Sequence, residues 1–196
     1  MENQNKVLLT VIGAATLLVA VVGATFAYFS ATGSETTATV QTGSSQINIQ
    51  ASEDAVENIR PTSWTTRAAA DTDANVEKFT LTMSGAVSGS GTYTISMNQP
   101  EITIGNITGD NGDLSDIRYA IFRGEETTAV KEGSFADATF TNGKVDLVVN
   151  ESYSAPAVTG EFTVYVWIEN ENADQNNLQE VSFKLTFAAN ATSTIE

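Results

Sequence analysis

EFTVYVWIE (residues 161–169) and EVSFKLTFA (residues 180–188) are the two segments that decide the fold. In both, large apolar side chains alternate with other residues, which is the period of a β-strand that has one face in a core. The core-facing positions are Phe162, Val164, Val166 and Ile168 in the first segment and Val181, Phe183, Leu185 and Phe187 in the second. The pattern predicts two strands of an antiparallel sheet.

Further segments of this kind are rich in Thr, Ser, Val, Ile, Phe and Tyr and are separated by Gly, Asn, Asp or Pro. They are residues 45–51, 76–84, 91–98, 101–107, 117–123, 134–140 and 144–149. Asn142 and Gly143 lie between the last two, and Asn-Gly is the strongest short-range signal for a hairpin. We therefore expect an all-β protein, with antiparallel strands in a two-sheet sandwich.

Helix is expected in few places. Residues 51–59 (ASEDAVENI) predict a short helix that ends before Pro61, and residues 67–75 predict either a loop or one helical turn. The exception is residues 7–27, VLLTVIGAATLLVAVVGATFA, which contain no charge and are long enough to cross a bilayer as a helix.

This N-terminal segment predicts export. It ends in Ala24-Thr25-Phe26-Ala27, which offers the small residues that a signal peptidase needs before a cut between Ala27 and Tyr28. Retention as a membrane anchor and burial as a core helix are the alternatives. The predicted organisation is residues 1–27 as signal peptide or anchor, residues 28–44 as a terminal segment, and residues 45–196 as the sandwich domain.

The amino-acid composition excludes several classes of partner and of catalytic site. The chain of 196 residues has a net charge of −15 and contains neither histidine nor cysteine. An acidic surface repels nucleic acid and anionic lipid, so we expect no nucleic-acid partner and membrane contact only through residues 7–27. Zinc sites of the usual kind and Ser-His-Asp or Cys-His catalysis need the absent residues. We expect no enzyme activity; a hydrolase built on paired carboxylates is the remaining catalytic alternative.

Two loops carry many oxygen ligands. Residues 109–116 (GDNGDLSD) hold Asp110, Asp113 and Asp116 beside two glycines, and residues 169–177 (ENENADQNN) form a second polar loop. Carboxylates gathered on a bending loop are how calcium is bound, so these three aspartates are candidate calcium ligands. A solvated turn is the alternative reading, and no other cofactor is expected. Trp167 lies on the opposite strand face from Ile168 and is expected either to pack or to be exposed.

The region around the export segment resembles a known family. Residues 23–30 (GATFAYFS) are similar to the junction that SipW-type signal peptidases process, and residues 37–43 followed by 45–49 resemble the glycine turn and first core strand of the same proteins. These belong to the TasA/camelysin family of Gram-positive surface and biofilm matrix proteins. Some members have been classed as proteases, but this chain has no HExxH motif and no histidine, so we expect no metalloprotease activity.

The resemblance implies a jelly-roll-like fold and a secreted fibre subunit at the cell surface. In that family the freed N-terminal segment adds as a donor strand to the sheet of a neighbouring subunit. The resemblance thus implies polymerisation through residues 28–44, with Tyr28, Phe29, Thr36, Thr37 and Thr39 as contact residues. Partners would be further copies or related matrix subunits, besides the signal peptidase. The alternative is a membrane-anchored ectodomain that binds a ligand, a cation or a host surface.

Overall fold

The long strand β10 (Ala157–Glu169) is the centre of the larger of two main sheets. It pairs antiparallel with β5 (Glu77–Ala86) on one side and with β7 (Ile117–Arg123) on the other. The computed structural model describes residues 37–42, 45–52, 55–57, 59–105, 107–179 and 181–194, all within the unit Thr36–Glu196. The predicted export segment lies outside these residues.

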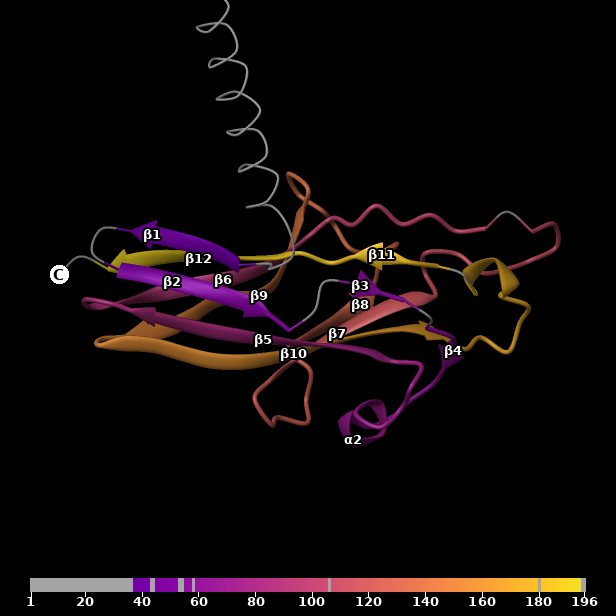
Figure 1. The fold of residues 1–196 in the computed structure, drawn as a ribbon, viewed down its shortest axis with the longest axis horizontal. Coiled ribbons are helices and arrows are strands. Elements are labelled where there is room, and N and C mark those ends of the chain that lie inside the picture. The colour runs from indigo at the N-terminus through magenta and orange to yellow at the C-terminus, as the bar shows by residue number, and fades with distance from the viewer. Residues whose placement is uncertain are drawn as a thin grey trace, which may run out of the picture. The chain divides into compact units, whose positions relative to one another are not determined.

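The described strands form three sheets (Figure 1). The seven-stranded sheet has the order β1 (Thr37–Thr42), β2 (Ser45–Ala51), β5, β10, β7, β8 (Lys131–Ser134), and β4 (Pro61–Thr62) pairs parallel with the end of β10. The three-stranded sheet has the order β12 (Phe187–Thr194), β6 (Ser90–Asn98), β9 (Lys144–Ser154). A small sheet pairs β11 (Phe183–Lys184) with β3 (Ala55–Val56). Helical turns are confined to α2 (Arg67–Ala70) and η1 (Asn176–Leu178) among the described residues.

One hydrophobic core lies between the two main sheets. It joins Phe79, Leu81 and Val164 of the large sheet to Ile95 and Leu147 of the small one. All eight positions that the alternation assigned to the core are buried. The prediction of an all-β protein with antiparallel sheets is therefore confirmed, and burial of these side chains is the main stabilising contribution.

A second, smaller cluster covers the outer face of β10. The ring centroids of Trp64 and Trp167 lie 4.7 Å apart, and Trp167 donates from Nε1 to a carboxylate oxygen of Glu169 at 2.8 Å. The buried guanidinium of Arg67 donates from Nη1 to the carbonyl oxygens of Gly124 at 2.5 Å and Glu126 at 2.7 Å. Trp167 thus packs, and both faces of β10 are covered.

Four local predictions were wrong. The predicted strand at residues 180–188 is divided, because Phe183–Lys184 pair as β11 with β3 whereas Phe187 begins β12, which pairs with β6. The described residues of the segment 51–59 do not form the expected helix, because Ala55–Val56 pair as β3 with β11 and Val56 is buried. Residues 101–105 and 107 have no strand structure, although Ile102 and Ile104 pack against the core. Residues 135–140 leave the sheet after β8, because the Ser134 hydroxyl accepts from the Asp137 amide at 3.0 Å and forms a turn.

The strand edges differ in how they are protected. β1 and β12 lie side by side at one edge of the two sheets (Figure 1). At the opposite edge, β9 pairs with β6 alone among the described strands. Lys131 of β8 reaches across and donates from Nζ to the backbone carbonyl oxygen of Asp146 in β9 at 2.6 Å. One eleven-residue strand therefore has an edge without a strand neighbour, and one ammonium group covers part of it.

Candidate functional site

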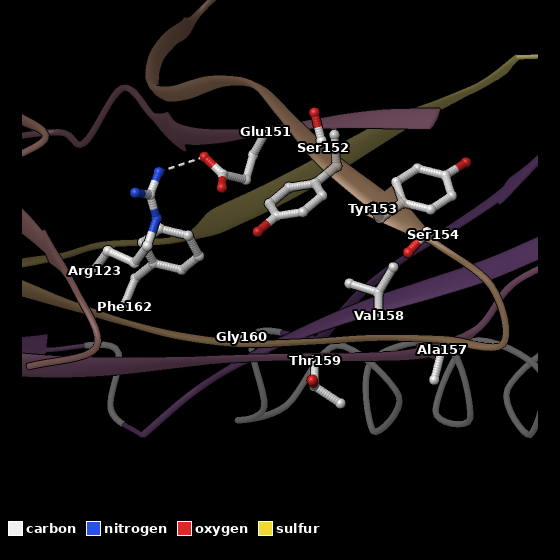
Figure 2. Close-up of a pocket in the computed structure, with 11 residues that line it drawn as sticks. Arg123, Glu151, Ser152, Tyr153, Ser154, Ala157, Val158, Thr159, Gly160 and Phe162 are labelled. Carbon is white, nitrogen blue, oxygen red and sulfur yellow. Dashed lines mark hydrogen bonds and ion pairs between the residues drawn. The ribbon is translucent and has the colours of Figure 1, made fainter. Parts of the chain in front are cut away.

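A cleft of about 370 Å³ opens between the two main sheets, beside the turn that joins β9 to β10. Figure 2 shows side chains from β7, β9 and β10 around it. The lining residues are Tyr93, Arg123, Glu151, Ser152, Tyr153, Ser154, Ala157, Val158, Thr159, Gly160 and Phe162. Strands β9 and β10 follow each other in sequence but belong to different sheets, so the chain itself forms one end of the cleft.

Gly160 helps to explain why there is space here. A Cβ atom at this position would meet the hydroxyl of Tyr93 at 3.6 Å and the ring of Phe162 at 3.7 Å, which are ordinary contact distances. Gly91 is different, because a Cβ there would lie 2.2 Å from the carbonyl oxygen of Thr192. Packing therefore requires glycine at residue 91 but not at residue 160. A glycine within a strand often marks a place where another group approaches the backbone.

Arg123 and Glu151 form an ion pair at the cleft that joins β7 to β9 (Figure 2). Arg123 also contacts the carboxylate of Glu126 at 3.4 Å, so one cation faces two carboxylates. Partial burial lowers the pKa of the Arg123 guanidinium. The carboxylates of Glu151 and Glu126 outweigh this effect, so the pKa is raised overall. The three side chains of Arg123, Glu126 and Glu151 together carry one uncompensated negative charge, which favours a cationic ligand.

Two buried polar atoms in the cleft lining have no hydrogen-bond partner within the described part of the chain. They are the hydroxyl of Tyr153 and Nε of Arg123. A buried donor without a partner destabilises the protein, and a ligand oxygen that accepts from this donor removes that cost. The phenol of Tyr93 is also shielded: burial, with the nearby charge of Glu151, raises the pKa of Tyr93 to about 12. The phenol therefore stays neutral at physiological pH.

These groups are suited to binding. The cleft offers aromatic and aliphatic walls, hydroxyl groups and the carboxylate of Glu151, whose partner Arg123 is shared with Glu126 outside the lining; together these match a small ligand with an apolar body and a positive charge. A second hollow of about 600 Å³ lies between β8 and β9 and is lined by Lys131, Asp137 and Asp146, among others. Several of its polar groups already bind each other, as the hydroxyl of Ser96 does with Asp146 at 2.7 Å. The first cleft is the stronger candidate.

The predicted calcium ligands each accept hydrogen bonds from other groups of the protein. Asp110 accepts from the backbone amides of Gly112 at 3.0 Å and Asn177 at 3.1 Å. Asp113 accepts from the hydroxyl of Ser115 at 2.5 Å and from its amide at 2.6 Å, and these two hydrogen bonds lower the pKa of its carboxyl.

The third aspartate, Asp116, is buried and accepts from Nε2 of Gln175 at 2.8 Å. Through Gln175 and Asn177 the two predicted polar loops dock on each other. No cluster of three or more acidic side chains suited to a metal occurs within residues 37–194 as far as they are described. Calcium binding stays a prediction that this geometry does not support.

The predicted assembly segment is described only in part. Ala27, Tyr28, Phe29 and Thr36 lie outside the described residues. Thr37 and Thr39 belong to β1, where they pair with Gln50 and Asn48 of β2. The described end of the terminal segment is thus an edge strand of the chain's own sheet. Among the described helices, none has the length and apolar character needed to cross a bilayer.

The sequence did not single out the cleft residues. Phe162 was expected in the core, whereas nothing in the sequence pointed to Arg123 and Glu151, because they meet only when two sheets face each other. Gly160 was the one available signal, since it interrupts the side chains of a strand that continues on both sides of it. The sequence prediction instead started that strand at residue 161.

Comparisons with models of known protein families and with curated proteins found no match for this chain, so the resemblance to the TasA/camelysin family stays an interpretation of its sequence.

Proposed function

We propose that the chain is a secreted structural protein of the cell surface or extracellular matrix, and that it forms fibres. In each contact, the N-terminal segment of one copy adds as a strand to a sheet of the next. The observation that carries this proposal is the open edge of β9, which has eleven residues and pairs only with β6 among the described strands. An unpaired edge of that length is a template for strand addition.

The connectivity and the export segment belong to the same proposal. The chain passes from the large sheet to the small one and back several times, from β5 to β6 to β7 and from β8 to β9 to β10, which is consistent with a jelly-roll-like arrangement. Residues 7–27 form the hydrophobic helix that directs export, and cleavage after Ala27 frees Tyr28. Residues 28–36 then join the next subunit, while Thr37 and Thr39 fix the base of that segment in β1.

Electron microscopy of two purified proteins tests the assembly. The chain of residues 28–196 is expected to form filaments, and the chain of residues 37–196 is expected to stay monomeric because it lacks the joining segment. Circular dichroism of both confirms that each has folded. If residues 28–196 remain monomeric at high concentration, or if the shorter chain forms the same filaments, the proposal is wrong.

Mass spectrometry of the exported product tests the processing step. We expect Tyr28 at the N-terminus of the protein recovered from cells. An intact Met1 favours the alternative function, a tethered ectodomain. Replacement of Ala27 by the bulkier leucine is expected to block the cut, because the peptidase requires a small residue at that site.

A further inference from the structure

We propose that the cleft beside Gly160 binds the free N-terminal residue of a neighbouring copy, Tyr28. The aromatic ring enters the space above Gly160, and the α-ammonium group binds the carboxylate of Glu151. This inference rests on the proposed function, since it needs cleavage before Tyr28 and contact between copies. It adds the acceptor site and the chemical feature that the site recognises.

The space above Gly160 suits a single side chain. At about 370 Å³, the cleft is at the small end of ligand pockets, which range from about 300 to 1,000 Å³. Its inner wall is formed by Tyr93, Val158 and Phe162, all of them buried. A Cβ at residue 160 meets nothing closer than 3.6 Å, so a larger native residue there would occupy the space that the sequence leaves open.

The charges at the cleft favour an amine. Among the described residues that line it, Arg123 and Glu151 alone are charged, and Arg123 is shared with the carboxylate of Glu126. A positively charged group next to Glu151 therefore completes two ion pairs without displacing Arg123. The side chain of Glu151 remains 28% exposed, so an incoming group can reach it.

The unpartnered atoms complement a tyrosine. The hydroxyl of Tyr153 and Nε of Arg123 are buried without a partner in the described structure. A phenolic oxygen in the cleft can accept from either one, which removes the cost of burying it. An aromatic ring with one polar atom at its tip fits this lining better than a purely aliphatic side chain does.

This chain supplies such a ligand itself. After the predicted cut, the new terminus is Tyr28-Phe29-Ser30, and residues 28–34 contain no charged side chain. The only positive charge at this end is then the α-amino group, whose pKa is about 7.7–8.0 in model peptides, so it is largely protonated at neutral pH. Glu151 and Tyr153 belong to β9, so residues that follow Tyr28 can continue along the open edge of that strand.

A binding experiment uses the full chain as receptor. Residues 1–27 are still attached in this protein, so it has no free Tyr28 of its own to occupy the cleft. The ligand is the peptide YFSATGSET, which corresponds to residues 28–36 and carries a fluorophore at its C-terminus. Fluorescence anisotropy in mild detergent is expected to show saturable binding. The N-acetylated peptide is expected to bind about tenfold more weakly or worse, because a charge-assisted hydrogen bond is lost.

Receptor variants locate the site. Gly160→Val fills the cleft and is expected to abolish binding, and Glu151→Gln is expected to weaken binding of the free-amine peptide to the level of the acetylated one. Thr82→Val is the matched control. Thr82 is an exposed residue of β5 opposite Glu161 in the neighbouring strand, so the variant places a valine on the same sheet but outside the cleft. Thermal unfolding confirms that each variant is folded, and Glu151→Gln keeps the test decisive if Gly160→Val does not fold.

The outcomes separate this inference from the proposed function. Equal binding of the free and acetylated peptides, unchanged binding by Glu151→Gln, or no binding at all overturns the inference. Filaments that form from residues 28–196 carrying Gly160→Val also overturn it, while they leave the fibre proposal standing. Failure of the wild-type residues 28–196 to form filaments overturns the fibre proposal, whatever the peptide does.

Discussion

Arg67 and Tyr165 are 98 positions apart in sequence, and Nε of Arg67 donates to the phenolic oxygen of Tyr165 at 3.3 Å on the outer face of the large sheet. The same phenol donates to a carboxylate oxygen of Asp71 at 2.7 Å. The carboxylate of Asp71 also accepts from Nζ of Lys78, and this ion pair has an N–O distance of 2.5 Å. This chain of contacts fastens the segment around α2 to β10 and β5.

Replacement of Arg67 by alanine is expected to lower the free energy of unfolding by about 2–3 kcal/mol, because the carbonyls of Gly124 and Glu126 lose a charged donor in a buried site. Urea denaturation at neutral pH measures this. Arg60→Ala is the control, because Arg60 is exposed, and a change of about 0.5 kcal/mol or less is expected there. Equal effects of the two changes would contradict the anchoring role of Arg67.

Alanine at two glycines is expected to have opposite effects. Gly91→Ala places a methyl group 2.2 Å from the carbonyl oxygen of Thr192 and 2.6 Å from the hydroxyl of Tyr153, so it is expected to cost about 1–3 kcal/mol. Gly160→Ala meets no close atom and is expected to stabilise the strand by about 0.5–1 kcal/mol. Chemical denaturation of both variants checks the pair, and destabilisation by Gly160→Ala would mean that the cleft is closed in solution.

The stability contributed by Asp71 is expected to depend on acid pH. Hydrogen bonds from Lys78 and Tyr165 lower the pKa of Asp71 below its ordinary value of 3.8. A lowered native pKa means that the contribution is complete above the unfolded-state pKa and is lost as the pH falls through the native one. The difference in unfolding free energy between wild type and Asp71→Asn is therefore expected to shrink below pH 3.8. Urea titrations at pH 7 and pH 2.5 test this, and a constant difference would contradict it.

Tyr93 is expected to affect stability at alkaline pH. Because burial raises its native pKa from 10.0 to about 12, its contribution is complete below pH 10 and is lost as the pH rises through 12. In Tyr93→Phe this part of the pH dependence should be absent, since phenylalanine does not ionise. Ultraviolet difference titration of the two proteins measures the phenolate directly, and ionisation of Tyr93 near pH 10 would show that the cleft is open to water.

The sequence predicted the elements whose side-chain pattern is complete within one segment. Strands β2 and β7 have the predicted bounds, and the alternation along β10 and around Phe183 identified core residues correctly. Asn142 and Gly143 adopt the positive φ angles of 53° and 74° that a tight hairpin turn requires. In these places local chemistry and the fold favour the same structure.

The wrong predictions involve partners that are distant in sequence. Residues 51–59 have the composition of a helix, but Val56 gains more from pairing with Phe183 in β11 than it would from a short isolated helix. The cleft could not be predicted for the same reason. Arg123 and Glu151 lie on β7 and β9, which belong to different sheets, and no periodicity records how two sheets face each other.

The contact between Lys131 and the backbone of Asp146 has a consequence for crowded surroundings. To pair with this stretch of β9, a strand of another molecule must break the hydrogen bond from Lys131 to Asp146. The ammonium group of Lys131 then has to be hydrated again. Strand addition is thereby limited to the part of β9 that follows Asp146, so in a dense layer this edge can take up a short incoming segment but not the full edge of a second molecule.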